Sequence, residues 1–239
     1  MNLAASRLAR RLILLAAVAW LAAPALAGDP KKVDALLKTR GFEGTIVLDA
    51  GIKADPALAA DSLAEGRTWL DKNAADAAAE LKQDPLVFKE GGRTFERKYS
   101  VRSIVADRYV SVLRDDYMDT HGAHPNSDVN TILWDRTARK RISIRPFFTE
   151  TADNGLTMTA ILRAVIAALR TEKKKRNASD TATTEWFKGL EPKLLKSGAV
   201  ALAPSSDLAK SSGLLFYYPP YAVGPYAEGQ YAAFVPWEC

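Results

Sequence analysis

The sequence of 239 residues predicts an α+β fold, in which an antiparallel β-sheet has helices packed on one face and forms two intimately packed sub-lobes. Three observations predict it. Apolar residues alternate with period two over residues 94–145, recur at helical spacing over residues 57–81 and 157–175, and return to strand-like runs after residue 199. Strands and helices that come in separate runs, without strict alternation, indicate helices on an antiparallel sheet.

The N-terminus is typical of a secretory signal peptide. Three arginines precede an apolar run over residues 12–23, and the small residues at 25–27 fit a cleavage site after Ala27, so that residues 1–27 would be removed. The run has about a dozen residues, whereas a membrane-spanning helix needs about 20. We therefore expect a periplasmic or secreted protein with no transmembrane segment after the signal peptide is cleaved.

Composition excludes some partners. The chain has 33 basic and 28 acidic residues, and the leader removes three arginines, which leaves 30 against 28 and a net charge of about +2. Nucleic-acid-binding proteins usually concentrate basic residues on one face, so we expect no nucleic-acid partner. Cys239 is the only cysteine, which excludes an internal disulfide and leaves the fold dependent on its apolar core.

The N-terminal half of the mature chain predicts a strand, a helix and a hairpin. Residues 44–49 form a β-branched strand. Residues 57–81 are rich in alanine and have helical spacing, so we expect a helix that lies on a sheet surface. Residues 94–114 alternate with period two around a turn at 106–108, which is typical of a hairpin of two long strands.

The second half continues the sheet. Residues 129–135 and 141–144 resume the alternation, so we expect an antiparallel meander of about four strands over residues 94–145. Residues 157–175 form the clearest helix, and its basic end at 173–176 complements the helix dipole and is expected to be solvated. The remaining predicted elements are a shorter helix over 184–195 and strands over 199–203, 213–218 and 230–236.

The stretch DTHGAHPNSD at 119–128 holds both histidines of the chain. His121 and His124 have a spacing that converges on a helix, but Gly122 and Pro125 forbid a regular helix here. A zinc site needs three or four ligands, and carboxylate-rich sites favour harder cations that need no histidine. We expect no metal and no cofactor, and interpret the stretch as a strand-to-strand connection in which His124 is a hydrogen-bonding brace.

Complete catalytic motifs are absent from the sequence. It has neither a G-x-S-x-G nucleophile elbow nor a glycine-rich phosphate loop after a strand, so we assign no catalytic residue. One alternative is a cell-wall glycan hydrolase or deacetylase-type enzyme that uses His124 with Asp116, Asp119 or Asp128 for acid–base chemistry. The sequence leaves enzymatic activity open and favours a non-catalytic protein.

Aromatic residues are concentrated near the C-terminus. We expect Phe216, Tyr218 and Phe234 to alternate into the core of a hairpin. Tyr221 and Tyr226 lie among prolines and glycines in the connecting loop, where exposed aromatic rings can stack on sugars or anchor a protein partner. For these two tyrosines the core and the surface alternatives stay open.

Two groups of motifs carry a resemblance to a known family. They are GAHPN at 122–126 with Trp134-Asp135 and ISIRPFF at 142–148, and GLLFYYPPYAVGPYAEGQ at 213–230 with VPW at 235–237. Together they resemble the extracytoplasmic domain of lysozyme-sensing anti-sigma factors, the RsiV-like domain, which also precedes the catalytic domain in PdaC-type peptidoglycan deacetylases. The resemblance implies an N-terminal PdaC-type module at 28–114 and an RsiV-like C-terminal domain at 115–239.

The resemblance also implies a function. It implies an exported α+β binding or sensing module of the cell envelope that lacks the catalytic domain of its relatives. The implied partner is a cell-wall glycan or a lysozyme-like protein, and we take His124, Asn126, Tyr221 and Tyr226 as candidate binding residues. The family usually has glycine in place of His121, so a two-histidine site is not a family property. A structural envelope protein without a small ligand is the other alternative.

Overall fold

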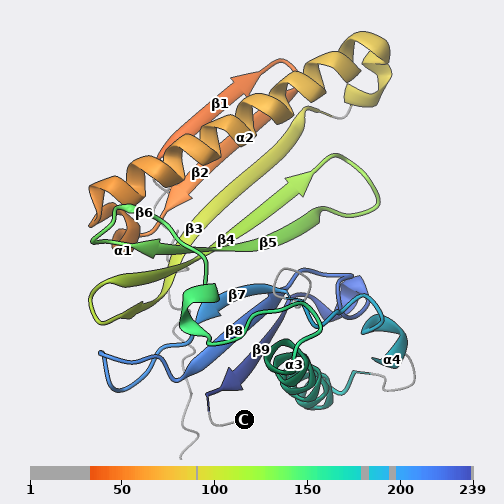
Figure 1. The fold of residues 1–239 in the computed structure, drawn as a ribbon. Helices are drawn as coiled ribbons and strands as arrows, with labels where there is room; N and C mark the ends of the chain where they lie inside the picture. The colour runs from red at the N-terminus through yellow and green to blue at the C-terminus, as the bar shows by residue number, and fades with distance from the viewer. Residues whose placement is uncertain (1–32, 90, 179–182, 194–197, 238–239) are drawn as a thin grey trace, which may run out of the picture. The chain divides into compact units, whose positions relative to one another are not determined.

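A computed structural model describes residues 33–89, 91–178, 183–193 and 198–237 (Figure 1). The predicted signal peptide lies outside these residues. Within them, no helix is both long enough and apolar enough to cross a membrane. Two β-sheets and two long helices make up most of the described chain, which confirms the predicted α+β class.

The larger sheet has six strands in the order β1-β2-β3-β4-β5-β6. Neighbouring strands are antiparallel except β2 and β3, which are parallel because α1 and α2 form the crossover between them. The meander from β3 to β6 was predicted, although its last strand ends at Arg141 and not at residue 144. Strand β1 and the parallel pair were not predicted. The elements are β1 (Ala35–Thr39), β2 (Phe42–Leu48), α1 (Ala50–Lys53), α2 (Pro56–Gln83), β3 (Arg93–Val105), β4 (Tyr109–Asp119), β5 (Asn126–Asp135) and β6 (Lys140–Arg141).

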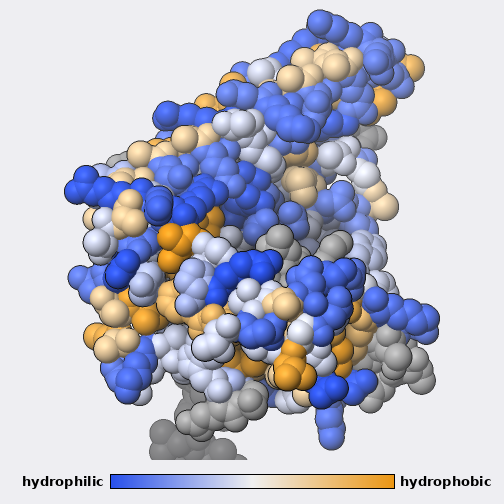
Figure 2. Space-filling model, viewed as in Figure 1, coloured by the Kyte–Doolittle hydropathy of each residue, from blue (hydrophilic) through white to orange (hydrophobic). Residues whose placement is uncertain are grey.

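Helix α2 lies along one face of this sheet, as predicted. Asp55 caps its N-terminus by accepting hydrogen bonds from the backbone of Ala57 and Leu58, each 3.1 Å long. Gly66 faces the sheet, where a Cβ atom would lie 2.6 Å from Cδ1 of Ile46, so this glycine permits a close approach of helix and strand. The outward face of α2 is largely hydrophilic (Figure 2). Its buried positions recur every three or four residues: Leu58, Ser62, Gly66, Leu70, Ala74 and Ala77.

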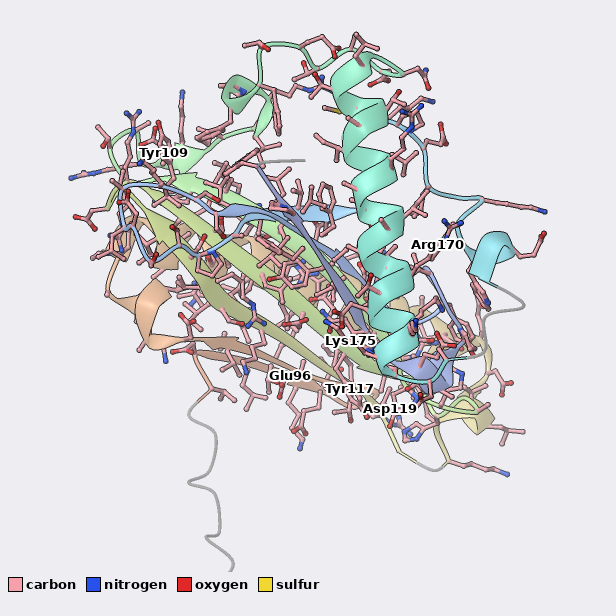
Figure 3. The ribbon with its side chains drawn as sticks, turned by 90° about the horizontal axis from the view of Figure 1, so that it is seen from below. Glu96, Tyr109, Tyr117, Asp119, Arg170 and Lys175 are labelled. Carbon is pink, nitrogen blue, oxygen red and sulfur yellow. The ribbon has the colours of Figure 1, made fainter. Side chains whose placement is uncertain are left out.

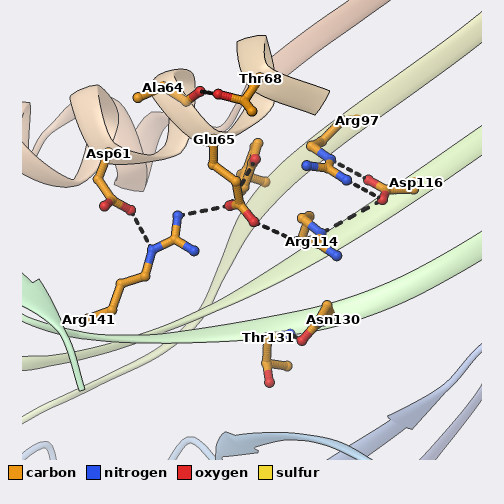
Figure 4. Close-up of polar contacts among 11 residues, drawn as sticks. Asp61, Ala64, Glu65, Thr68, Arg97, Arg114, Asp116, Asn130, Thr131 and Arg141 are labelled. Carbon is orange, nitrogen blue, oxygen red and sulfur yellow. Dashed lines mark hydrogen bonds and ion pairs between the residues drawn. The ribbon is translucent and has the colours of Figure 1, made fainter. Parts of the chain in front are cut away.

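Charged side chains connect α2 to the sheet (Figure 4). Arg97 and Asp116 form a bidentate pair with distances of 2.7 and 2.6 Å, and both side chains are 4% exposed. Glu65 of α2 accepts hydrogen bonds from Arg114 at 2.6 Å and Arg141 at 2.8 Å. Burial raises the pKa of Glu65, but these arginines outweigh it and the net pKa is lowered, so the network stays ionised.

The smaller sheet has the order β7-β8-β9 and carries α3 on one face. Phe216 and Tyr218 are buried, as predicted, and they lie in one core cluster with the apolar stripe of α3. Phe234 was predicted to be buried, and this is wrong: it is 45% exposed because alternate residues of β9 face away from α3. The elements are α3 (Leu156–Lys175), β7 (Ala199–Leu202), β8 (Gly213–Tyr218) and β9 (Tyr231–Pro236).

Short helical segments complete the described chain. The helix predicted over 184–195 is wrong in length, because only α4 (Thr183–Trp186) is helical and the residues up to 193 form turns and irregular chain. The last two residues of that prediction lie outside the described part. The 3₁₀-helices are η1 (Pro85–Phe88), η2 (Arg145–Phe147) and η4 (Tyr226–Glu228).

Hydroxyl groups of the larger sheet form hydrogen bonds with backbone groups of β7, an edge strand of the smaller sheet. Ser103 Oγ donates to the carbonyl oxygen of Leu202 at 2.6 Å, and Thr131 Oγ1 donates to that of Val200 at 2.7 Å. The backbone N–H of Leu202 donates to Ser111 Oγ at 3.0 Å. These bonds join the two sheets and give the edge strand partners in place of another chain. The predicted division at residues 114 and 115 stays a prediction, and it falls inside β4.

Candidate functional site

Two loops far apart in the sequence bring three predicted residues together. The β4–β5 loop carries His124, and the connection from β8 to β9 carries Tyr221 and Tyr226. His124 Nε2 lies 3.0 Å from the hydroxyl of Tyr221. The ring of His124 stacks on Tyr226 with centroids 3.9 Å apart and planes inclined by 21°. We call His124, Tyr221 and Tyr226 the aromatic cluster.

The hydrogen bonds of His124 define its neutral tautomer. Nδ1 lies 2.9 Å from the carbonyl oxygen of Pro125, which can only accept, so Nδ1 carries the proton. In the neutral ring Nε2 therefore accepts, and the hydroxyl of Tyr221 donates to it. This direction leaves the oxygen of Tyr221 with acceptor capacity for a ligand.

Tyr221 is held in a strained backbone conformation. Its φ is 71°, in the left-handed region that bulky residues rarely adopt. It lies inside the turn of residues 219–222, which is closed by a 3.1 Å hydrogen bond from Ala222 N to the carbonyl oxygen of Pro219. The side chain of Tyr221 is 51% exposed. Backbone strain on a half-exposed aromatic residue is a feature of functional sites, because the surrounding structure must offset its cost.

His121 does not join the cluster. Its Nε2 lies 3.0 Å from the carbonyl oxygen of Gly92, and its backbone N–H donates to Asp119 Oδ1 at 2.9 Å. The two histidines of the hairpin loop thus bind different parts of the chain. Across the described ranges no group of three or more His, Cys, Asp or Glu side chains could hold a metal.

The carboxylates near the histidines have other roles. Asp116 is buried against Arg97 on the face of the sheet that α2 covers, and Asp128 is its register partner on β5. Asp119 accepts from the backbone of His121. The remaining predicted residue, Asn126, begins β5 opposite Met118 with an exposed side chain, and no described contact joins it to the aromatic cluster.

The connection from residue 219 to 230, which we call the aromatic loop, is anchored by residues that the sequence interpretation missed. The basic end of α3 was predicted to be solvated, and for Lys173 this is wrong: it is 2% exposed. Its Nζ lies 2.5 Å from Glu228 Oε2, and the hydroxyl of Tyr231 donates to the same oxygen at 2.7 Å. Arg176 donates to the carbonyl oxygens of Glu228 and Gln230 at 3.0 and 2.8 Å.

Two signals in the sequence could have found this anchor. Lys173 continues the four-residue series of Ile161, Val165 and Leu169, which places it on the buried stripe of the helix. Glu228 is the only acidic residue between positions 208 and 237. A buried lysine requires a partner of opposite charge, and Glu228 supplies it.

Glu228, the acidic member of the anchor, is ionised at neutral pH. Burial raises the pKa of Glu228, but the hydrogen bonds from Lys173 and Tyr231 outweigh burial, so the net pKa is lowered. Burial and the neighbouring Glu228 raise the pKa of Tyr231 to about 12. Glu228 is therefore a carboxylate that accepts from a lysine ammonium and a neutral phenol.

The end of α3 and the β4–β5 hairpin lie at the same end of the described chain. Figure 3 shows Lys175, in the last turn of α3, at the end where Tyr117 and Asp119 of β4 also lie. Asp115, two residues before Tyr117 on β4, has a hydrogen bond with the side chain of Gln230. The aromatic loop is thus fixed both to α3 and to the larger sheet.

Comparisons with known proteins concern the second half of the chain and the fold. Residues 151–238 match the family model described as protein of unknown function (DUF3298). No curated protein matches the chain. The match runs from before α3 to β9, so it includes the aromatic loop and its anchor but not His124.

Solved structures that are similar to this chain include two DUF3298 family proteins. A DUF3298 family protein from Pseudomonas aeruginosa PAO1 has a TM-score of 0.53 and 17% identity, with 85% of this chain and 87% of that chain covered. A member of the same family from Bacteroides fragilis NCTC 9343 has a TM-score of 0.42 and 15% identity, with 77% and 67% covered. The first likeness concerns the fold alone. Residues 151–238 therefore match the DUF3298 domain, and the described fold is similar to that of a solved DUF3298 family protein.

Proposed function

We propose that the protein is an exported, non-catalytic binding module of the bacterial cell envelope, and that its aromatic cluster binds a cell-wall glycan. The observation that carries the proposal is the stack of His124 on Tyr226, with the strained and half-exposed Tyr221 beside it. These rings come from two separate loops, and each is held by hydrogen bonds or packing. They form a preorganised aromatic surface on which Tyr221 is exposed and His124 and Tyr226 are partly exposed.

The chemistry of the cluster suits a sugar. The faces of aromatic rings carry a partial negative charge, and they attract the C–H groups on the apolar face of a pyranose ring. The oxygen of Tyr221 can accept a hydrogen bond from a sugar hydroxyl, because its proton is directed to His124. A few oriented polar groups beside aromatic side chains are typical of small-ligand sites.

Export and the cell-wall ligand draw support from the sequence. The leader at residues 1–27 directs the mature chain across a membrane in this proposal. The resemblance to RsiV-like and PdaC-type modules supports a place in the envelope, and the peptidoglycan deacetylases among those relatives support a wall glycan as ligand. The DUF3298 match agrees with this reading only at the level of a family of unknown function.

The geometry favours binding over the acid–base alternative. A general base must lie within hydrogen-bond reach of the group that it serves. Asp116 is 5% exposed and held by Arg97, and Asp119 accepts from the backbone of His121. Both nitrogens of His124 are engaged within the protein, which suits a role as a brace for the tyrosines.

Titration of residues 28–239 with peptide-free peptidoglycan strands and with chitin oligosaccharides tests the proposal. We expect saturable binding to the wild type and at least roughly tenfold weaker binding after Tyr226→Ala, since a tenfold change corresponds to about 1.4 kcal/mol, within reach of one aromatic contact. Phe234→Ala is the matched control, because Phe234 is an exposed aromatic residue outside the cluster.

A lysozyme is the second titrant, because the resemblance also implies a lysozyme-like partner. Binding of lysozyme without binding of either glycan would overturn the glycan assignment and keep the binding module. Absence of binding to all three by a folded protein would overturn the proposed function.

A further inference from the structure

The aromatic loop needs an anchor to serve as a binding surface. It connects β8 to β9 over residues 219–230, and its only regular element is the three-residue helix η4. Loops of this length ordinarily sample several conformations. The stacking of Tyr226 on His124 at 3.9 Å requires that the loop keep one conformation.

A buried ion pair joins the aromatic loop to α3. Lys173 Nζ and Glu228 Oε2 are 2.5 Å apart, with side chains 2% and 16% exposed. A Cβ atom on Gly224 would lie 2.6 Å from Lys173 Nζ and 2.3 Å from Glu228 Oε2. The pair therefore contacts the segment between Tyr221 and Tyr226, and a glycine at 224 is what leaves room for it.

The ion pair connects the aromatic loop to a long helix, α3. Lys173 lies in the last turn of α3, where the helix dipole favours a cation. From the same turn, Arg176 donates to the carbonyl oxygens of Glu228 and Gln230, and its guanidinium lies 4.1 Å from the ring centroid of Tyr231. The loop is thus held by a buried charge and by two backbone contacts, all from the end of one helix.

We propose that Lys173, Glu228 and Arg176 are positioning residues: the ion pair and the hydrogen bonds of Arg176 together latch the aromatic loop to α3. The latch presents Tyr221 and Tyr226 to His124 and to a ligand. The ligand part rests on the proposed function. The positioning part does not, because the contact between Tyr226 and His124 is measurable without any ligand.

The test uses the ring protons of His124 in nuclear magnetic resonance spectra of the whole mature chain. The stacked ring of Tyr226 shifts these protons upfield, and the shift is lost when the loop moves. We expect Glu228→Gln and Lys173→Met to move the His124 signals towards solvent-exposed values and to weaken binding of peptidoglycan strands by roughly tenfold, because an unanchored loop must be ordered on binding. Glu185→Gln is the matched control, since it breaks a surface ion pair. The side chains of Glu185 and Lys188 are both 68% exposed.

Unchanged His124 signals in both variants would overturn the proposal, whatever the affinities are. Shifted signals in a protein whose wild type binds no glycan would support the latch and overturn only the proposed ligand. If both variants fail to fold, Arg176→Gln provides the test, because Arg176 is exposed and bonds to the loop only through Glu228 and Gln230 carbonyl oxygens among its described hydrogen bonds. Its His124 signals should move in the same direction, and unmoved signals would overturn the proposal.

Discussion

Tyr221 and His124 are 97 positions apart in the sequence, yet the hydroxyl of one lies 3.0 Å from Nε2 of the other. This bond joins the β4–β5 hairpin to the aromatic loop between β8 and β9. Tyr221 has a φ of 71°, which a tyrosine adopts only when other contacts offset the strain. The pair therefore links the two halves of the candidate site and marks where stability and function are expected to oppose each other.

Replacement of Tyr221 by asparagine should separate stability from binding. Asparagine tolerates the left-handed region far better than tyrosine, so the strain of about 1–3 kcal/mol is relieved while the ring and its hydrogen bond are lost. We expect a free energy of unfolding within about 1 kcal/mol of the wild type, and at least roughly tenfold weaker glycan binding. Urea denaturation and titration measure the two quantities, and full affinity in this variant would exclude Tyr221 from the site.

Protonation of Asp135 should lower the stability of the protein in acid. Its hydrogen bonds from Arg108, and those from the backbone of Thr137 and Ala138, lower its pKa to about 2. A free aspartate has a pKa of about 3.9, so this contribution is fully present above that value and is lost as pH falls towards 2. Asp135→Asn should flatten the fall of the melting temperature between roughly pH 4 and 2.

The control for Asp135 is an exposed carboxylate. Asp76 pairs with Lys72 on the surface of α2, with a side chain that is 57% exposed. Asp76→Asn should leave the pH dependence of the melting temperature close to that of the wild type. Identical profiles for Asp135→Asn and the wild type would contradict the assignment.

The pair of Arg97 and Asp116 should respond strongly to loss of one partner. Asp116→Asn leaves the buried guanidinium of Arg97 without its charge partner, and we expect a loss of about 3–5 kcal/mol in the free energy of unfolding. Lys72→Met, which breaks an exposed pair, should cost about 0–1 kcal/mol. A double replacement of Arg97 and Asp116 by leucine should recover part of the loss, as judged by urea denaturation, and equal effects of the two single variants would contradict the burial of the pair.

Gly66 in α2 should resist replacement by alanine. Alanine favours an exposed helix by about 1 kcal/mol over glycine, but its Cβ would lie 2.6 Å from Cδ1 of Ile46. We expect overpacking to outweigh helix propensity and to lower stability by about 1–2 kcal/mol. Gly189→Ala is the control, because nothing lies within 4 Å of the added atom, and Ile46→Val should relieve the loss in Gly66→Ala.

The spacing of apolar residues along the sequence predicted those helices and strands that bury one regular face. The alternation from residue 94 and the apolar stripe of 157–175 each match an element of the structure, β3 to β6 and α3. Periodicity did not predict β1 or the parallel pairing of β2 with β3, because pairing depends on partners distant in sequence. It also placed Phe234 in the core, although alternate residues of β9 face away from α3.

The candidate site shows the same division. Tyr221, Tyr226 and His124 were chosen because of their residue types and their place in loops, and the fold brings all three together. Asn126 was chosen on the same grounds, and no described contact joins it to them. Residue type and loop position do not define which side chains meet.

The sequence by itself determined the α+β class, the main helices and most strands of this protein, because these follow from local spacing of apolar residues. Only the tertiary structure decided that Lys173 is a buried partner of Glu228, and that His124 stacks on Tyr226. The physical reason is that a charge or an aromatic ring is stabilised by what lies across space from it. Those neighbours here are 55 positions away in the first case, and they come from a different loop in the second.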